Sequence, residues 1–464
     1  MATLDSYRSR LDHLLRELAA DLGIPGAACG VLLDGDAHVA SWGVANVATG
    51  AAVLPGTLFQ IGSITKVYTA TLVMQAVHAG VVALDEPVRA QLQEFSVADP
   101  GATIEITPRH LLTHTSGIEG DHLVDTGWNA DALGRYVATL AGLGQLHPPD
   151  EAYSFCNTGY GVLGRLLEAA TGDDFDRVLR RRLTRPLGCR ATVTLPQHAL
   201  LHSVAVGHRH TVEEPPSRQP RWTLTRANGP MGGVVAPAAE LLALARLHLD
   251  HGRGPSGEEL LAPVAVEDMQ RLHADTPIPG EAQALGWTVR PWGTLTSLGL
   301  DADTFGQRAA LRLVPERRFA LCVLANSPRG GVLAQALMGH VAADLLDVTA
   351  PDPSDPVGDS PAAATAADLG AAGGTYERLH QRVTVAVEDG RLHLRTEPSG
   401  VLQALGLGPT VLGVEPTGRA GPSLTAMGTD PATGQREVVV VLLPTGATQP
   451  GALYLGGRLH RRVT

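Results

Sequence analysis

The chain has 464 residues, which allows two or three domains at roughly 100–200 residues each. Hydrophobic residues make up 44% and charged residues 18% of it, a globular composition that argues against wholesale disorder. The 36 Lys and Arg against 47 Asp and Glu give a formal net charge of −11, so the composition provides no general electrostatic footprint for DNA or RNA.

The N-terminal segment carries acidic and basic residues throughout, with no apolar core followed by a small-residue cleavage site. We therefore predict no signal peptide and expect a cytoplasmic protein. No window approaches about 18 uninterrupted apolar residues, so no membrane partner is expected. The sequence contains no CxxC, zinc, phosphate-loop or nucleotide signature, and we expect neither a metal nor a cofactor.

The first predicted element is an amphipathic helix with Leu11, Leu14, Leu15 and Leu18 at helical spacing. Two strands joined by a turn at Asp34-Gly35-Asp36 follow it, and residues 63 to about 250 show a mostly helical pattern. Strands at 306–315 and 318–327 and a helix at 331–347 then close this part. Strands at both ends predict an α/β (α+β) domain whose antiparallel sheet is assembled from the two ends, with flanking helices and a helical region.

Residues 350–372 are rich in Pro, Ala, Asp and Ser without an apolar period, which is typical of a linker. Beyond them the pattern has a period of two, with a hairpin turning at Asp389-Gly390 and further strands at 436–444 and 452–460. We therefore predict a first domain over residues 1–349 and a small all-β domain over 373–464.

Lys66 is the only lysine in the chain, so every other basic side chain apart from histidine is an arginine. A GC-rich coding sequence explains a general replacement of lysine by arginine, but it leaves this exception unexplained. Arginine does not deprotonate in proteins, whereas a buried lysine can become neutral and act as a base. Lys66 is therefore a candidate catalytic residue before any motif is considered.

Ser63-Ile64-Thr65-Lys66 opens a helical run, which places Ser63 and Lys66 one turn apart on the same face. A serine at a helix N-terminus lies near backbone N–H groups and the positive end of the helix dipole. Both favour the negative charge that develops as the serine attacks a carbonyl. Alone, SxxK is a weak pattern that many unrelated chains contain by chance.

The SxxK pattern becomes specific when it is taken together with its neighbours in the chain. Four segments occur in a characteristic order and spacing: FQIGSITKVYTA, GVVALDEPV, ITPRHLLTHTSGI and NTGYGVLG. They closely resemble the serine β-lactamase and penicillin-binding-protein-like hydrolases. The likeness is to the branch with class C β-lactamases, esterases, D-aminopeptidases and the penicillin-binding-protein-type thioesterases that cyclise peptides. It covers about residues 10–345. Members of this group often carry a C-terminal lipocalin-like β-barrel, which is similar to the all-β domain predicted here.

The resemblance implies that Ser63 is the acyl-accepting nucleophile and that Lys66 is its base or proton relay, with a pKa lowered by burial and neighbouring dipoles. The family's Tyr-x-Asn motif aligns with Phe155-Cys156-Asn157, so Asn157 is kept as a catalytic residue and the phenol is missing. The third motif, His-x-Gly or Lys-Thr-Gly, aligns with Leu300-Asp301-Ala302. Two polar positions of the family therefore carry apolar side chains.

We expect Phe155, Leu300 and Asp301 at substrate-binding positions, in a cleft more apolar than that of an ordinary hydrolase. Without the phenol as a general acid an amine leaves poorly, whereas a thiol, with an unperturbed pKa of about 8.5, leaves as the thiolate. The site thus suits a thioester or activated ester better than an amide or β-lactam. Arg458 is a candidate that reaches the site from the β-domain and binds a carboxylate or oxyanion, the alternative being a solvated surface arginine.

Four other residues are candidates for a role at the site or in the core. Cys156 is a second nucleophile or, as we favour, a small buried residue. His114 is expected to be structural. His208 and His210 are candidates to stand in for the missing polar group.

The sequence predicts a serine acyl-enzyme hydrolase or acyltransferase acting on an ester or thioester of a small acyl, peptidyl or natural-product substrate, free or bound to a carrier protein. One alternative is a catalytically silent binding protein that uses the same cleft. Another is an atypical tailoring cyclase that exploits the apolar cleft. The sequence does not distinguish hydrolysis from transfer or cyclisation.

Overall fold

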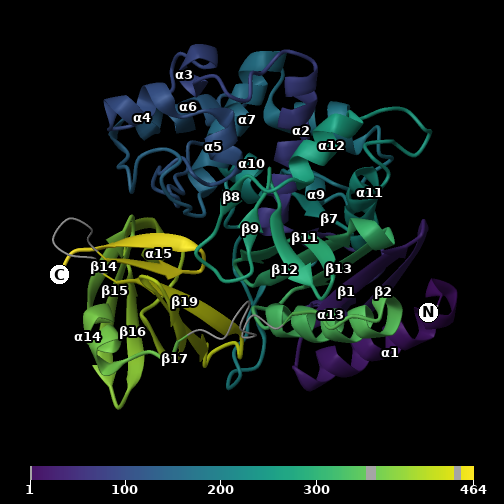
Figure 1. Ribbon diagram of the computed structural model, residues 1–464. Helices are drawn as coiled ribbons and strands as arrows, with labels where there is room; N and C mark the ends of the chain where they lie inside the picture. Colours follow the sequence, from purple (N-terminus) through teal and green to yellow (C-terminus); the bar gives the residue numbers. More distant parts are fainter. Residues whose placement is uncertain (1–2, 352–361, 444–450) are drawn as a thin grey trace.

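The computed structural model describes residues 3–351, 362–443 and 451–464. An α/β unit built around a large sheet lies beside a C-terminal β-barrel, drawn in yellow-green at the lower left of Figure 1. The fold class predicted from the sequence, a β-lactamase-like antiparallel sheet with flanking helices followed by a small all-β barrel, is confirmed.

The sheet of the first unit has, in the described residues, the strand order β3-β2-β1-β13-β12-β11-β10-β9-β8. Strand β1 near the N-terminus pairs antiparallel with β13 near residue 320, with Ala27 opposite Ala325 and Leu33 opposite Phe319. The sheet is therefore assembled from the two ends of the domain, as the pattern predicts. Its strands are β1 (Gly26–Leu33), β2 (Asp36–Asn46), β3 (Ala51–Ala52), β8 (Ala274–Asp275), β9 (Ala282–Gln283), β10 (Thr288–Trp292), β11 (Leu295–Thr304), β12 (Gln307–Val314) and β13 (Phe319–Ala325).

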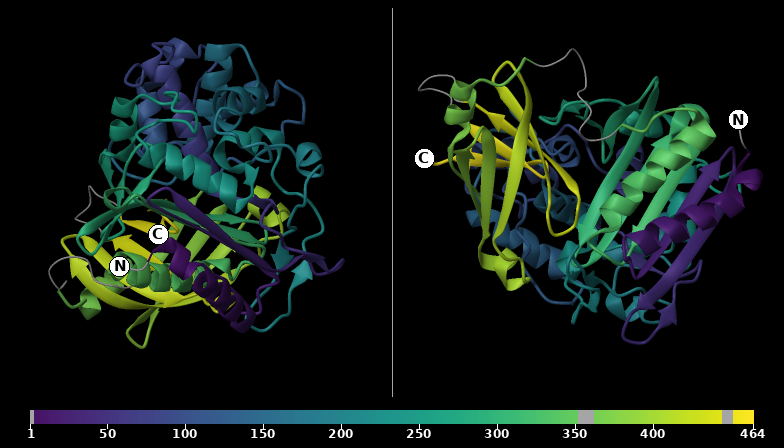
Figure 2. Two further views of the ribbon diagram at one scale, coloured as in Figure 1. Left: turned by 90° about the vertical axis from the view of Figure 1, so that its right-hand side faces the viewer. Right: turned by 90° about the horizontal axis from the view of Figure 1, so that it is seen from below.

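Helices α1 (Leu4–Asp21) and α13 (Gly330–Leu346) lie side by side on one face of this sheet (Figure 2). Leu11 and Leu15 of α1 are fully buried and join the apolar side chains of β1, β13 and α13 in one core cluster. The 3.6-residue spacing of these leucines brings them to the same face of the helix, so the amphipathic helix predicted at the N-terminus is confirmed.

The other face of the sheet is covered by the helical region, whose central helix is α2 (Thr65–His78). Nearly every side chain of α2 is buried, in agreement with a sequence that is apolar on all sides of the helix. The remaining helices of this region are α3 (Val88–Gln91), α4 (Pro100–Glu105), α5 (Pro108–Leu112), α6 (Ala132–Ala138), α7 (Asn157–Thr171), α8 (Phe175–Leu179), α9 (Pro196–Ala199), α10 (Gly229–Gly232), α11 (Ala238–Leu249) and α12 (Pro263–Gln270). Two small strand pairs, β4 (Phe59–Gln60) with β7 (Val235–Ala236) and β5 (His208–Arg209) with β6 (Ser217–Arg218), complete it.

The C-terminal domain is a closed up-and-down barrel in which each strand pairs with the next and β21 returns to β14. The predicted hairpin turn at Asp389-Gly390 joins β15 to β16, and both turn residues have positive φ. The predicted strand at 452–460 is two strands, because Gly456 and Gly457 form a tight turn within it. The barrel strands are β14 (Gly374–Arg378), β15 (Gln381–Glu388), β16 (Arg391–Pro398), β17 (Thr410–Ala420), β18 (Ser423–Thr429), β19 (Arg436–Leu442), β20 (Ala452–Leu455) and β21 (Arg458–Arg462).

The predicted linker divides into two parts. Residues 352–361 lie outside the described residues. Residues 366–372 form helix α14 (Ala366–Ala372), which packs Leu369 and Ala372 into the barrel core; a second short helix, α15 (Gly400–Ala404), follows β16. The composition of the linker conceals α14 because its seven residues are mostly small.

The barrel docks on the helical region through the turn between β20 and β21. The Phe155 N–H donates to Gly457 O at 3.0 Å, and the Leu459 N–H donates to Ser154 Oγ at 3.2 Å. Leu146, beside α6, packs with Leu459 and two other barrel side chains in a small apolar cluster. These contacts bring barrel residues to the loop that precedes α7.

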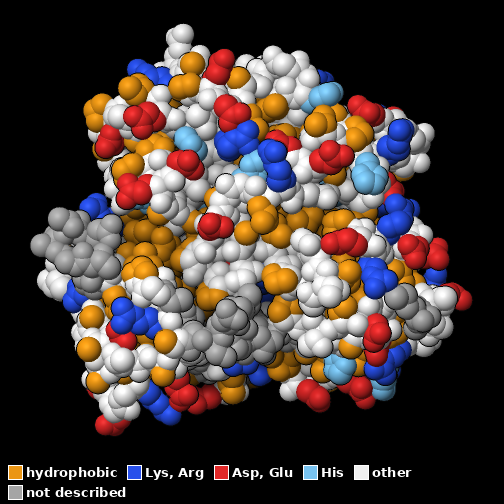
Figure 3. All heavy atoms as spheres, in the orientation of Figure 1, with side chains coloured by type: hydrophobic (Ala, Val, Ile, Leu, Met, Phe, Trp, Pro, Cys, Tyr) orange, Lys and Arg blue, Asp and Glu red, His pale blue; other side chains and the backbone are white. Residues whose placement is uncertain are grey.

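Acidic and basic side chains are interspersed over the face of the molecule drawn in Figure 3, so the described residues there form no broad basic area. Among the described residues, no helix combines the length and the apolar character needed to cross a membrane.

Candidate active site

Ser63 lies in the 3₁₀ turn Gly62–Ile64, which leads directly into α2. Gly62 has a φ of +48°, and a Cβ at this position would lie 3.1 Å from Ala302 Cβ and 3.0 Å from Thr304 Cγ2. Glycine is therefore needed because the turn must both adopt a left-handed conformation and approach the end of β11 closely. The result places Ser63 where the helix begins, beside the sheet.

Lys66 lies one turn further along α2 and is completely buried. Its Nζ contacts three oxygens: Ser63 Oγ at 3.0 Å, Asn157 Oδ1 at 2.7 Å and the backbone carbonyl of Met231 at 2.7 Å. Two of these, the amide and backbone carbonyl oxygens, can only accept hydrogen bonds. A neutral amine has two N–H groups, which these two carbonyls satisfy, and its lone pair is then directed at the Ser63 hydroxyl.

The charge state of Lys66 is set by its surroundings. Burial and, to a smaller extent, the positive charge of Arg458 lower the pKa of Lys66 to about 7, against the opposing effect of the negative charge of Asp121. An ordinary lysine is almost entirely protonated at neutral pH, whereas this one is half neutral. The arrangement can therefore remove the proton of Ser63 at physiological pH.

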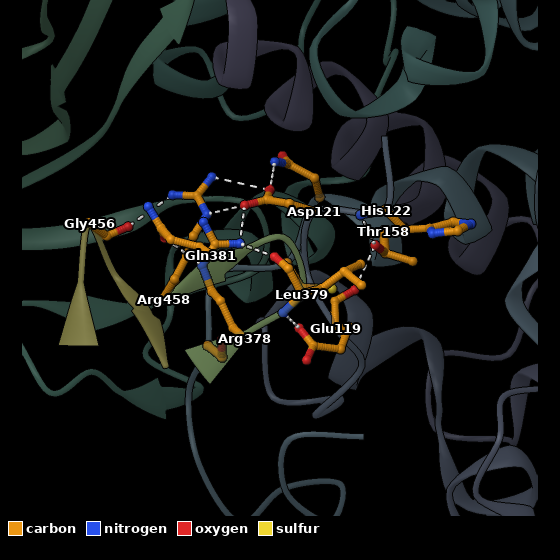
Figure 4. Close-up of polar contacts among 12 residues, drawn as sticks. Glu119, Asp121, His122, Thr158, Arg378, Leu379, Gln381, Gly456 and Arg458 are labelled. Atoms are coloured by element: carbon orange, nitrogen blue, oxygen red, sulfur yellow. Dashed lines mark hydrogen bonds and ion pairs between the residues drawn. The ribbon is translucent and has the colours of Figure 1, made fainter. Parts of the chain in front are cut away.

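Asn157 is the first residue of α7 and connects Lys66 to a buried carboxylate. Its Nδ2 donates to Asp121 Oδ1 at 2.7 Å, while its Oδ1 accepts from Lys66. Asp121 is 4% exposed and also accepts from Arg458 Nε and Arg378 Nη1, each at 2.8 Å (Figure 4). Although burial alone raises it, these guanidinium groups and the Asn157 amide hold the pKa of Asp121 well below its usual range.

Phe155, which the resemblance aligns with the tyrosine of the Tyr-x-Asn motif, lies against the basic groups of the site. Lys66 Nζ is 4.7 Å and Arg458 Cζ is 4.8 Å from the centroid of its ring. The structure thus brings together Ser63, Lys66, Asn157 and Phe155, as expected from the resemblance, and it adds Arg458, for which the sequence left two interpretations open. Arg458 reaches the site from β21 of the barrel and is not an ordinary solvated surface arginine.

Two other expected substrate-binding residues lie elsewhere on β11. Asp301 points away from Ser63, because side chains alternate along a strand and Ala302 is the residue that faces Gly62. It pairs instead with Arg312 at 2.7 Å and Arg290 at 3.5 Å, so the structure does not bring Asp301 to Ser63. Leu300 is 6% exposed and packs in the core cluster of the helical side, so its part in substrate binding stays a prediction.

The interpretation of Cys156 as a second nucleophile is also wrong. Its thiol is 1% exposed, accepts from the Gly159 N–H at the start of α7, and has a pKa that burial raises to about 11. His114 is structural, as expected: its Nδ1 accepts from the Cys156 N–H at 3.0 Å, and its ring packs on Phe155 with centroids 4.6 Å apart.

His208 and His210 do not replace the missing polar group. His208 Nδ1 lies 2.8 Å from the backbone oxygen of Asn326, and His210 Nδ1 lies 2.8 Å from Ser327 Oγ. Both side chains therefore bind the segment after β13, and neither contacts Ser63 or Lys66.

Sequence reasoning missed Asp121, Arg378 and the Met231 carbonyl. A backbone carbonyl has no sequence signal, and Arg378 is one of many arginines on strands of alternating pattern. Asp121 had one weak signal, because it lies three residues beyond the ITPRHLLTHTSGI segment, but Glu119 and Asp125 lie close to it and nothing in the sequence separates the three.

Comparisons with known proteins identify the family of the chain. Residues 11–346 match the sequence profile of the family described as Beta-lactamase. The chain is 39% identical over 360 residues to penicillin-binding protein 4 of Amycolatopsis lactamdurans, covering 76% of this chain and 93% of the relative. It is 30% identical over 201 residues to esterase EstB of Burkholderia gladioli, covering 40% of this chain and 51% of that protein.

The fold extends over the barrel as well. The crystal structure of SurE superposes with a TM-score of 0.78 at 27% sequence identity and covers 99% of this chain and 100% of SurE. A second structure of SurE holds D-Leu and gives a TM-score of 0.77 at 28% identity over the same shares of both chains. Because the family profile spans most of the first unit and penicillin-binding protein 4 is similar over nearly its whole length, this chain belongs to the beta-lactamase family of serine hydrolases.

Proposed function

We propose that the protein is a serine acyl-enzyme hydrolase or acyltransferase that takes its acyl group from an ester or thioester, with Ser63 as nucleophile and Lys66 as base. The observation that carries this proposal is the contact of the buried Lys66 Nζ with Ser63 Oγ at 3.0 Å, by an amine whose pKa is about 7. A base at the operating pH must be partly neutral, and this one is.

In the proposed acylation step, the lone pair of neutral Lys66 takes the Ser63 proton as Oγ bonds to the carbonyl carbon of the substrate. The tetrahedral intermediate expels a thiolate or alkoxide and leaves an acyl-Ser63 ester, and the proton on Lys66 passes to the leaving group or to solvent. Deacylation is the reverse chemistry with water or another nucleophile. The start of α2 supplies backbone N–H groups and a dipole end that favour the negative oxygen.

The preference for an ester or thioester rests on Phe155, whose ring carries no acidic proton. A second phenol near Lys66 does not compensate, because the Tyr160 hydroxyl donates to Leu112 O at 3.1 Å. Thiolates and activated alkoxides leave without protonation, whereas amines do not. The similarity to an esterase supports an ester, and the D-Leu held by SurE supports an aminoacyl or peptidyl acyl group.

Arg458 is the proposed substrate-binding cation. Its Nε and Nη2 donate to Asp121 and its Nη1 donates to Gly456 O, which leaves one further N–H on each terminal nitrogen; because a quarter of the side chain is exposed, these N–H groups are the proposed donors to an anionic group of the substrate. Phe155 provides the apolar surface beside it.

The test is intact-mass measurement after incubation with a fluorophosphonate and with an activated acyl thioester. We expect one adduct per chain, lost in Ser63→Ala, and faster acylation by the thioester than by a matched amide. Labelling that persists in Ser63→Ala would refute the nucleophile assignment. The absence of any adduct on the native protein would favour a catalytically silent binding protein with the same cleft.

A further inference from the structure

The barrel provides both arginines that neutralise Asp121. Arg378 lies at the end of β14 and Arg458 at the start of β21, and each places a guanidinium nitrogen 2.8 Å from Asp121 Oδ2. The Arg378 side chain is 7% exposed and that of Asp121 5% exposed. A carboxylate this deeply buried is costly unless it is paired, so the charge of Asp121 is tolerated because the barrel is docked.

Asp121 in turn fixes the orientation of the Asn157 amide. A carboxylate only accepts hydrogen bonds, so Asn157 must present Nδ2 to Asp121 and Oδ1 to Lys66. Without that acceptor the amide could rotate and donate Nδ2–H to the lone pair of a neutral Lys66. That lone pair is the one the proposed mechanism needs for the Ser63 proton.

We propose that Asp121 is a positioning residue of the active site and that Arg378 and Arg458 hold it, so that the docked barrel sets the orientation of Asn157 and, through it, of the Lys66 amine. This inference rests on the proposed function. It assigns the barrel a part in assembling the catalytic groups, beyond any contact with the substrate.

The charges around Lys66 make the inference measurable. The titratable groups that face it from the neighbouring loop and α7 are His114, Cys156 and Tyr160. Burial lowers the pKa of the histidine and raises the pKa of the thiol and of the phenol, so all three are neutral near pH 7. Asp121 and Arg458 are the charged groups that act on Lys66, in opposite directions.

Because Lys66 is the only lysine, protein grown with ¹³C-labelled lysine gives one Cε signal, whose pH titration follows this side chain without any need for turnover. We expect Asp121→Asn to move the titration midpoint to lower pH and Arg458→Gln to move it to higher pH. The matched control is Arg382→Gln, an exposed arginine on β15 whose partner is Glu377, and it should leave the midpoint unchanged.

Acylation of Ser63 by the activated thioester supplies the second readout. At a pH where Lys66 is fully neutral, Arg378→Gln and Asp121→Asn should each slow labelling about tenfold, since small misplacements of reacting groups carry losses of this order. If Arg378 acts through Asp121, Arg378→Gln should add less than a further twofold loss in the Asp121→Asn background. Circular dichroism identifies variants that fail to fold, for which Asp121→Glu and Arg378→Lys are the substitutes.

Two results would overturn the inference and leave the proposed function standing, provided that the native protein acylates. In the first, Asp121→Asn and Arg378→Gln acylate as fast as Arg382→Gln. In the second, the losses in Asp121→Asn and Arg378→Gln multiply independently in the double variant. Native protein that does not acylate would overturn the proposed function. In that case the lysine titration still decides the inference, which fails if the midpoint is the same in Asp121→Asn, Arg458→Gln and the control.

Discussion

The pH dependence of acylation is the most direct consequence of the buried lysine. Only neutral Lys66 can accept the Ser63 proton, and its pKa is about 7. The neutral fraction is then about one tenth at pH 6, one half at pH 7 and nine tenths at pH 8, because each pH unit changes the ratio of the two forms tenfold. The rate constant for labelling Ser63 should therefore rise about tenfold from pH 6 to pH 8 and then level off.

The assay is single-turnover acylation with a thioester that does not itself titrate in this range, followed by intact mass. Lys66→Arg keeps the positive charge but has no available lone pair, so it should lose at least about 10²-fold in rate at pH 8, the low end of a general-base contribution. A flat profile between pH 6 and 8, or native rates in Lys66→Arg, would refute the assignment of Lys66 as the base.

Three further outcomes follow from the geometry. Phe155→Tyr places a hydroxyl on a ring whose centroid is 4.7 Å from Lys66 Nζ, so it should raise turnover of an amide more than that of the matched thioester. The control is Tyr160→Phe, which removes a phenol that donates to Leu112 O; it should leave the ratio of amide to thioester turnover unchanged. Cys156→Ser keeps the N-cap of α7 and should keep Ser63 labelling within about twofold, because the thiol is a capping group; loss of labelling at full folding would contradict that role. Between about pH 7 and 10.5, Lys66 is neutral in the native protein but still protonated in the unfolded chain, whereas Lys66→Met has no such group. The free energy of unfolding of the wild type, relative to that of Lys66→Met, should therefore rise by up to about 5 kcal/mol over this range when measured by urea unfolding. A difference that does not depend on pH would contradict the lowered pKa.

Local patterns account for what the sequence predicts well. The residues of the turns at Asp34-Gly35 and Asp389-Gly390 have positive φ, a conformation that aspartate and glycine tolerate. Apolar and polar side chains alternate along the strands on either side of Asp389-Gly390, as is typical of hairpins. Ser63 and Lys66 lie three positions apart where α2 begins, so their contact is local and can be predicted from their spacing in the sequence. Phe155 and Asn157 could be placed because their segment aligns with a motif.

Contacts between distant parts of the chain are not visible in this way. Arg458 and Asp121 are separated by 337 positions, and no spacing rule relates a residue on a barrel strand to a loop of another domain. The position of Asp301 has a simpler origin. It is the middle residue of the aligned third motif, and consecutive side chains of a strand point to opposite faces of the sheet, so Ala302 faces Gly62 and Asp301 does not.

The loss of the phenol and the presence of Arg458 are best understood together. In a site with tyrosine at position 155, a second group could help to move the proton of Ser63; with phenylalanine, Lys66 must do so alone. The ring of Phe155 has Arg458 over it at 4.8 Å and Lys66 at 4.7 Å, and the nearby positive charge of Arg458 favours the neutral form of the lysine. The barrel arginine therefore increases the fraction of Lys66 that is neutral at physiological pH, which the proposed mechanism requires, and it does so from a strand that the sheet domain does not contain. Arg458→Gln tests this electrostatic role. The pH at which the acylation rate reaches half of its plateau should shift upward, while the plateau rate should fall by no more than in Asp121→Asn.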